Sequence, residues 1–355
     1  MEHLKKDETP KVKKKRRWPI VLLIILIVIT LILGGSALAI YLSIGDMTPE
    51  QTPTIAAAEP VERDNEVLDS YTVRYNDKLY RYNDQIVTLL LLGVDHEEPD
   101  VTEGSVDSDV YADVVLLAAI DMKNNKVSFY TISRDTMCDF AIPDSQTGGT
   151  VNVNGQLALT FSYGDGGKTS CEMTKNAVSQ ILFDLPIYSC SALYIKGLGP
   201  LNDAVGGVTV TVLEDLRYGY SSMRLGEEVT LNADMAERYI RTREYTAEGN
   251  LKRMERQKQY FKALLSQVLT IVRQDYTKVL DVYDAVKDDV ITDLSVGDIL
   301  YLASKAVNMD ISGDIQSVPG EVTLSSDNYV EYIIDKNALT DIIDIIMSIY
   351  YEEVN

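Results

Sequence analysis

Histidine and cysteine are scarce in this chain. Only His3 and His96 are present among 355 residues, and the three cysteines, Cys138, Cys171 and Cys190, show no metal-ligand spacing. The chain therefore has too few of these residues to favour a histidine-based zinc site or a Ser-His-Asp triad. Cys171 could pair with Cys190, but three unpaired cysteines that behave as small hydrophobic residues fit the sequence equally well.

Positive charge is also scarce beyond the first 18 residues. Those residues hold eight Lys or Arg against three Asp or Glu, a net charge of +5, so the remainder carries −26 when the total is −21. Such an acidic domain is repelled by nucleic acid and by an anionic membrane surface. The sequence therefore predicts no nucleic-acid partner, and the tail is too short for a DNA-binding fold.

One long hydrophobic run lies near the N-terminus. Residues 20–42 carry no charge, and six basic residues precede them between Lys11 and Arg17. A helix of this length, rising about 1.5 Å per residue, crosses a hydrocarbon core of roughly 30 Å. Because basic flanks stay in the cytoplasm, we expect a single-pass cell-membrane protein whose domain lies outside the cytoplasm. The alternative is a signal peptide cleaved near Ala39, although a usual h-region is shorter than this run.

The domain organisation follows from this membrane segment. We expect a cytoplasmic basic tail at 1–18, a transmembrane helix at 19–42, an extracytoplasmic linker at 43–69 and one large domain at 70–355. The linker contains three prolines and no apolar period, which is typical of a spacer. A hydrophobic content of 46% with 25% charged residues is sufficient for a globular core in the rest.

Several segments of the domain have strand patterns. Alternating residues at 71–82 predict a hairpin, and the apolar segment 86–94 predicts a strand buried on both faces that ends at Asp95. Two further strands are expected at 114–120 and 126–132. A tight turn near residue 124 pairs residues whose numbers sum to about 248, which places Asp113 opposite Arg134 and Asp135 within a residue or two.

Helical periodicity appears between and after these strands. Segments 171–183 and 231–239 have helical patterns, and the strongest helical signal covers 251–272. Segment 201–205 precedes a Gly-Gly turn, and 208–213 is a further β-rich run. There an apolar stripe lies beside a face that carries Arg253, Arg256 and Gln257. Alternating strands and helices predict an α/β layered fold with no internal repeat.

Arginines and aspartates suggest the chemistry. Five arginines fall within nineteen residues of this acidic domain: Arg238, Arg241, Arg243, Arg253 and Arg256. Guanidinium groups bind phosphate oxygens bidentately, and aspartates at strand ends can hold Mg²⁺ together with substrate phosphate. This combination suits phosphoryl transfer. The alternative is that the arginines pair with Glu237, Glu244, Glu248 and Glu255 on a solvated face.

The same segments resemble the LytR-CpsA-Psr family of anchored cell-wall glycopolymer ligases. The matching segments run in order along nearly the whole exported part: LLLLGVD ending at Asp95, ADVVLLAAID around Asp113, KVSFYTISRDT, VNGQLALTFSYGDGG, LNDAVGGVTVTV, LNADMAERYIRTRE, RMERQKQYFKALL and TDLS. The resemblance implies a layered α-β-α domain with a central mixed sheet.

The resemblance also implies an activity and a set of site residues. It implies a metal-dependent phosphotransferase that moves a glycan phosphate from a polyprenyl-pyrophosphate carrier onto peptidoglycan. Asp95 and Asp113 would bind the metal, Mg²⁺ or alternatively Mn²⁺. The pyrophosphate would be held by the residues that match the family's basic positions: Arg134, Arg241, Arg243, Arg253 and Arg256, with Gln257. Asp135, Glu244 or Glu248 could act as the general base, beside the catalytic Arg134, Arg241 and Arg243.

Two positions depart from the family pattern. Tyr111 stands where the family usually has Arg, and Asn250 stands where it usually offers Asp. Two alternatives to the ligase therefore stay open. One is a hydrolase that cleaves the same donor with water and releases the glycan, and the other is a catalytically weak glycolipid-binding paralogue. The sequence leaves the glycopolymer, the acceptor sugar and the oligomeric state undetermined.

Overall fold

The computed structural model describes residues 59–60, 62–63, 66–67, 72–75, 78–82, 85–97, 110–144, 147–182, 185–216, 223–242, 247–274, 279–311, 313–326, 329–334 and 351–353. The expected tail at 1–18, transmembrane helix at 19–42 and most of the linker lie outside these residues. Within the described ranges, no helix combines the length and the apolar character needed to cross a membrane.

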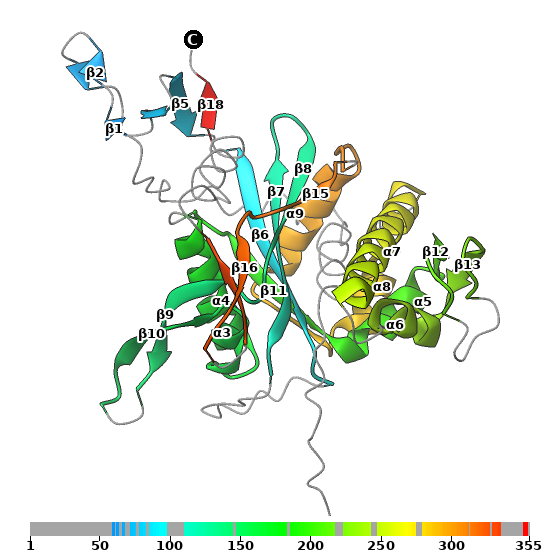
Figure 1. Cartoon of the computed structure of the whole chain (residues 1–355). Helices are drawn as coiled ribbons and strands as arrows, with labels where there is room; N and C mark the ends of the chain where they lie inside the picture. Colours follow the sequence, from blue (N-terminus) through cyan, green and yellow to red (C-terminus); the bar gives the residue numbers. More distant parts are fainter. Residues whose placement is uncertain are drawn as a thin grey trace, which may run out of the picture.

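A six-stranded sheet forms the centre of the domain (Figure 1). Its strands, in spatial order, are β14 (Val290–Thr292), β11 (Ser189–Tyr194), β6 (Ile86–Val94), β7 (Ala112–Asp121), β8 (Lys126–Ile132) and β15 (Ile315–Ser317). β6 is parallel to β11 and antiparallel to β7, while β8 is antiparallel to β7 and parallel to β15. The expected central mixed sheet is therefore confirmed.

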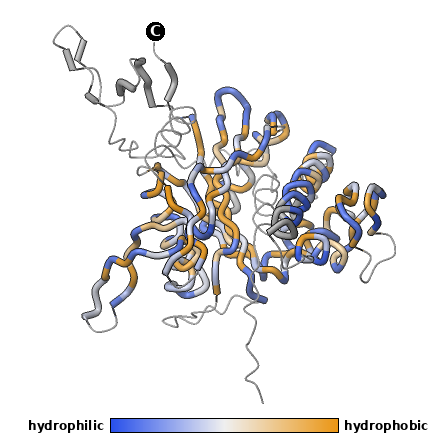
Figure 2. The backbone as a smooth tube through the Cα atoms, in the orientation of Figure 1, coloured by the Kyte–Doolittle hydropathy of each residue, from blue (hydrophilic) through white to orange (hydrophobic). Residues whose placement is uncertain are grey.

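The central strands are apolar because both of their faces are covered. All nine residues of β6 are buried, as are nine of the ten residues of β7. Continuous apolar runs, in place of alternation, are typical of strands with helices on both sides. Figure 2 shows the hydrophobic colouring concentrated along these strands.

Helices cover both faces of the sheet, so the domain has the expected α-β-α layers (Figure 1). On one side lie α3 (Leu159–Ser162) and α4 (Lys168–Ile181). On the other side lie α5 (Leu198–Ala204), α6 (Ala233–Arg241), α7 (Ala247–Gln274) and α8 (Val279–Val286). The remaining helices are η1 (Ile195–Gly197) and α9 (Val296–Ala306). The helix expected at 251–272 thus extends by a few residues at each end.

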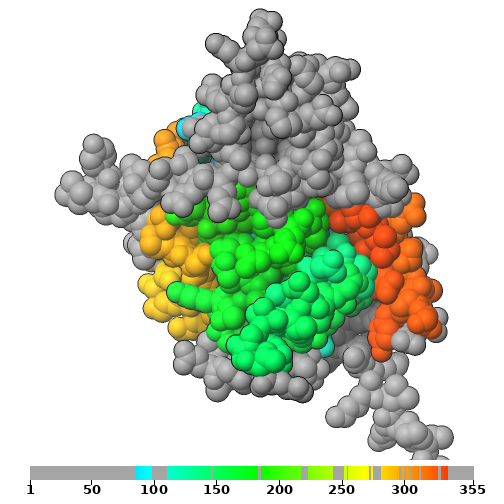
Figure 3. Space-filling model, turned by 90° about the vertical axis from the view of Figure 1, so that its left-hand side faces the viewer, coloured from blue at the N-terminus to red at the C-terminus, as the bar shows by residue number. Residues whose placement is uncertain are grey.

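Smaller sheets surround this core. β4 (Thr72–Tyr75) and β5 (Lys78–Tyr82) form the hairpin expected at 71–82, and β5 also pairs with β18 (Tyr351–Glu353). The hairpins β9–β10 (Met137–Pro143, Thr150–Gln156) and β16–β17 (Glu321–Leu324, Val330–Ile333) lie side by side in Figure 3. The fourth hairpin joins β12 (Val208–Thr211) to β13 (Glu228–Leu231).

The end of the expected linker contains three short strands. β1 (Glu59–Pro60) pairs with β4, while β2 (Glu62–Arg63) pairs with β3 (Glu66–Val67). Two-residue strands are held by backbone hydrogen bonds, which require no apolar pattern. For this reason the sequence pattern predicted a linker here and not these strands.

Candidate active site

The β7–β8 hairpin brings Asp113 to Arg134. Val115 pairs with Ile132 and Asp121 with Lys126, so paired residues sum to 247, one less than expected. Continuing this register by two residues places Asp113 directly opposite Arg134. The guanidinium Nη1 of Arg134 forms an ion pair with Oδ1 of Asp113, and only 5% of the Asp113 side chain is exposed. The predicted meeting of these residues is thus present.

Asp95 reaches the same edge of the sheet from β6. Gly93 pairs with Val114, but the next residue, Val94, pairs with Ala112, so Asp113 is the extra residue of a bulge. Bulges turn a side chain away from the regular alternation of a strand. Asp95 follows Val94 directly, and the C-terminal end of β6 therefore lies beside the start of β7. The backbone positions of Asp95 and Asp113 are therefore neighbours at one edge of the sheet.

Tyr111 and Asp135 complete the surroundings of Arg134. The guanidinium carbon of Arg134 lies 5.8 Å from the centre of the Tyr111 ring, a distance at which the ring face attracts a cation. Nε of Arg134 lies 3.7 Å from Oδ1 of Asp135. Tyr111, where a second arginine was expected from the family pattern, therefore contributes an aromatic support for Arg134.

Gln156 was not among the predicted site residues. Its Nε2 donates to Oδ1 of Asp135 at 3.3 Å and to the carbonyl oxygen of Val330 at 2.6 Å. The backbone N–H of Tyr332 donates to the Asp135 carbonyl oxygen at 2.8 Å. Asp135 is therefore held by β10 and β17. The signal for Gln156 was its place in the VNGQLALTFSYGDGG segment, but only tertiary packing reveals its partner.

A second cluster of polar side chains lies where α6 meets α7. Arg253, Arg256 and Gln257 are 3%, 0% and 1% exposed. Arg256 forms an ion pair with Glu214, donates to the carbonyl oxygen of Thr242, and lies 5.8 Å from the centre of the Tyr239 ring. Burial lowers the pKa of Arg256, and the charge of Glu214 opposes that change. Arg256 therefore lies beneath the surface, where it supports the α6–α7 junction.

Gln257 and Arg241 belong to the same cluster but have different partners from Arg256. Nε2 of Gln257 donates to the carbonyl oxygen of Ile240 at 3.1 Å. Arg241, on the last turn of α6, forms an ion pair with Glu237. Arg243 lies outside the described residues, and only the backbone of Asn250 is described, within α7.

The expected solvated alternative holds for part of the arginine cluster. Arg241 is paired with Glu237, as that alternative expects. Arg238 is arranged similarly: it is half exposed, and its Nε lies 3.8 Å from Oδ2 of Asp234. The solvated alternative does not fit the buried Arg256. Glu255 is paired with Lys258 at 3.0 Å instead of with an arginine. The side chains of Glu244 and Glu248 lie outside the described residues.

The orientation of α7 relates the two clusters. Nε of Arg273, near the end of α7, donates to the carbonyl oxygen of Val307, and Asp310 shortly after it pairs with Lys126 at the start of β8. The C-terminal end of α7 therefore lies at the β7–β8 turn. Since α7 is antiparallel to β8, its N-terminal end points toward the sheet edge that holds Asp113 and Arg134.

The contact between Phe129 and Phe261 supports this geometry. The two rings meet edge to face with their centres 5.4 Å apart, which fixes the middle of α7 against β8. From there, Ile132 at the end of β8 lies about 10 Å along the strand at roughly 3.3 Å per residue, and Arg134 follows two residues later. Arg253 lies about 12 Å along the helix in the same direction at roughly 1.5 Å per residue. Both residues therefore lie toward the same end of the domain.

The carboxylates of Asp95 and Asp113 determine which metal ions could bind at this edge of the sheet. Among the described residues, no group of three or more His, Cys, Asp or Glu side chains is arranged to hold a metal ion. Zinc sites need three or four such ligands. Mg²⁺ usually takes one or two carboxylates and completes its coordination with water and substrate phosphate. The all-oxygen pair Asp95 and Asp113 therefore fits Mg²⁺ or Mn²⁺ in donor chemistry.

Comparison with known proteins identifies the family. The family model described as "LytR_cpsA_psr family" matches residues 40–347. The chain belongs to the LytR-CpsA-Psr family. This confirms the resemblance drawn from the sequence segments, which lie within the matched range.

The relatives of this LytR-CpsA-Psr protein include teichoic acid transferases. The polyisoprenyl-teichoic acid–peptidoglycan teichoic acid transferase TagU of Oceanobacillus iheyensis is 26% identical over 324 residues, covering 89% of this chain and 92% of its own. The solved structure of Bacillus subtilis TagU is 20% identical with a TM-score of 0.51, covering 76% of this chain and 99% of its own. The structure of TagT bound to LIIa-WTA is 16% identical with a TM-score of 0.53, covering 74% of this chain and 90% of its own. These two structural likenesses show the fold.

Proposed function

We propose that this protein is a phosphotransferase that moves a glycan phosphate from a polyprenyl-pyrophosphate carrier onto a hydroxyl group of peptidoglycan. The observation that carries the proposal is the ion pair of Asp113 with Arg134, next to the end of β6 where Asp95 follows, at the sheet edge toward which the arginine-bearing end of α7 points. A diphosphate needs both a cation and guanidinium groups to offset its charge. The names of the TagU relatives support the same activity.

Each residue has a proposed role in binding the donor. Asp95 and Asp113 would hold Mg²⁺ or Mn²⁺, and the bound cation would neutralise charge on the diphosphate. Arg134, Arg241, Arg243 and Arg253 would bind the phosphate oxygens. Arg256 and Gln257 are buried beneath the surface and support these residues. Arg256 is paired with Glu214, and Gln257 donates to the carbonyl oxygen of Ile240, so these contacts fix the start of α7 against α6.

Asp135 is the proposed general base for transfer. It would accept the proton of the acceptor hydroxyl while that oxygen bonds to the glycan-side phosphorus and the bond to polyprenyl phosphate breaks. Gln156 and the neighbouring Arg134 orient its carboxylate.

The proposed location follows the substrates. A polyprenyl carrier lies in the membrane, and peptidoglycan lies outside it. We place the protein in the cell membrane by residues 19–42, with its N-terminus in the cytoplasm and the folded domain outside. Addition of a protease to intact cells would test this placement by showing whether exposed residues of the domain are cleaved from outside.

The reaction test uses the full-length protein in detergent with Mg²⁺, a glycan linked to polyprenyl pyrophosphate, and a peptidoglycan acceptor. Glycan attached to peptidoglycan is the expected product. Free glycan would instead indicate the hydrolase, and bound donor without turnover would indicate a glycolipid-binding paralogue. Either of these two results would overturn the transferase proposal.

Variants of one aspartate test the proposed base. Asp135→Asn should lower kcat by roughly 10²-fold with little change in KM, since base catalysis typically contributes this much. Asp139→Asn is the matched control, because Asp139 lies on β9 and accepts only from Asn154 among the bonds described for it. Equal rates for Asp135→Asn and the control would exclude Asp135 as the base.

A further inference from the structure

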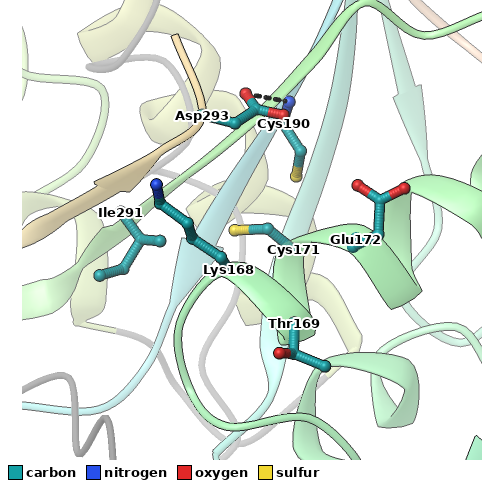
Figure 4. A pocket seen from close by; sticks show the side chains of 7 residues that line it. All are labelled: Lys168, Thr169, Cys171, Glu172, Cys190, Ile291 and Asp293. Carbon is teal, nitrogen blue, oxygen red and sulfur yellow. Dashed lines mark hydrogen bonds between the residues drawn. The ribbon is translucent and has the colours of Figure 1, made fainter. Parts of the chain in front are cut away.

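A pocket lies on the opposite side of the sheet from α7 (Figure 1). It has a volume of about 380 Å³ and opens between the first turn of α4 and β11. Seven residues line it: Lys168, Thr169, Cys171, Glu172, Cys190, Ile291 and Asp293 (Figure 4). Cys190 pairs with Leu90 of β6, and Asp95 lies about 16 Å further along that strand at roughly 3.3 Å per residue. The pocket is therefore separate from the candidate active site.

Two cysteines from distant elements meet in this pocket. Cys171 lies in the first turn of α4, and Cys190 is the second residue of β11. Both thiols are free, and both side chains line the same pocket. Figure 4 shows both sulfur atoms directed into the group of lining side chains. The third cysteine, Cys138, lies on β9 and lines no part of this pocket.

Charged groups surround the two thiols. Nζ of Lys175 lies 2.6 Å from Glu172 and 3.7 Å from Asp293. Oδ1 of Asp293 accepts the backbone N–H of Cys190 at 3.1 Å. Burial raises the pKa of the Cys190 thiol well above its usual value, with smaller contributions from Cys171 and Asp293, while Lys175 lowers it. Cys190 is therefore protonated at neutral pH until a reaction partner is in place.

We propose that Cys171 and Cys190 are a modification site at which a disulfide forms by exchange with a small external disulfide that enters the pocket. The sulfur of Cys171, the more exposed of the two, attacks the external disulfide, forms a mixed disulfide and releases one thiol. The sulfur of Cys190 then attacks the Cys171 sulfur and releases the second thiol. The two protein thiols lose two electrons and two protons, and the external disulfide is reduced to two thiols.

The resulting bond would join the start of α4 to the central sheet. It closes a chain segment of about 20 residues, for which a disulfide is expected to raise Tm by about 5–10 °C through its effect on the unfolded state. Oxidation would therefore strengthen the face of the domain opposite α7. Because the pocket lies apart from Asp95, Asp113 and Arg134, the proposal does not depend on the transferase activity.

Peptide mapping tests the bond directly. The full-length protein in detergent is incubated natively with glutathione disulfide, remaining thiols are alkylated, and the protein is digested with trypsin. The three cysteines fall on three different tryptic peptides, 135–168, 169–175 and 176–196. The expected product is peptide 169–175 linked to peptide 176–196, two hydrogen atoms lighter than their sum, with Cys138 alkylated.

Two results would overturn the proposal. One is alkylation of both Cys171 and Cys190 after native incubation with the disulfide, and the other is a mixed glutathione adduct that never resolves to the linked peptides. Thermal unfolding gives a second readout: Cys138→Ala should retain the increase in Tm on oxidation, whereas Cys171→Ala and Cys190→Ala should lose it. If those variants do not fold, the peptide map of the unaltered protein still decides.

Discussion

Replacement of Glu214 by alanine is expected to destabilise the protein by about 2–4 kcal/mol. Arg256 is completely buried and forms its ion pair with Glu214, so the variant would leave a buried guanidinium without its carboxylate. Removing one partner of a buried pair typically costs about 3–5 kcal/mol. The bond from Arg256 to the Thr242 carbonyl oxygen and the Tyr239 ring remain, which places the estimate toward the lower end.

A double-mutant cycle separates the pair from its surroundings. Arg256→Met should cost less than Glu214→Ala, because the remaining Glu214 side chain is 27% exposed and can reach water. The double variant should be more stable than the sum of the two single effects predicts, by about 1–3 kcal/mol. Urea unfolding of the full-length protein in detergent, followed by far-UV circular dichroism, gives each free energy.

The matched control is Glu255→Ala. Glu255 is mostly exposed and pairs with Lys258 on the surface of α7, so its loss should change the free energy of unfolding by less than about 0.5 kcal/mol. If Glu214→Ala were as mild as this control, or if the two single effects simply added, the buried pair would not be holding α7 against the rest of the domain.

Three further variants test local features by urea unfolding. Asp165→Ala should cost about 1–2 kcal/mol because Asp165 accepts three backbone N–H groups at the start of α4. Burial acts to raise the pKa of Asp165, but these hydrogen bonds outweigh it and lower the pKa. The stabilisation should therefore be present above about pH 4 and lost as the pH falls through the lower folded-state pKa. The alanine variant should not show this loss of stability at low pH. Phe261→Ala should cost about 3–5 kcal/mol because the ring is buried against Phe129; a cost below 1 kcal/mol would contradict the packing. Gly207→Ala should destabilise more than Gly206→Ala, since both have positive φ but only at Gly207 would the new Cβ lie 2.9 Å from a carbonyl oxygen; equal effects would contradict this close approach.

Local sequence patterns were sufficient to predict the part of the site built by β6, β7 and β8. The apolar run that ends at Asp95 and the tight turn near Asn124 determine strand positions and register without information from elsewhere in the chain. The register was off by one residue in its sum, yet Asp113 and Arg134 still meet, because a hairpin register is anchored at its turn.

Tertiary partners could not be predicted in the same way. The periodicity of α7 identified its apolar stripe, but it gave no indication that the neighbouring face with Arg256 and Gln257 is buried as well. That face is covered by α6 and by the segment after β12, and Glu214 lies 42 residues before its partner in the sequence. Gln156 likewise reaches Asp135 only because β10 folds back along β9.

The rate of glycan transfer by Asp95→Asn tests the central claim most directly. The claim is that the carboxylates at the ends of β6 and β7 hold the cation that offsets the charge of the donor diphosphate. The full-length variant should fold as the unaltered protein does, by circular dichroism, and should transfer glycan to peptidoglycan at a rate lower by roughly 10²-fold or more at saturating donor. Transfer at an unchanged rate would contradict the claim.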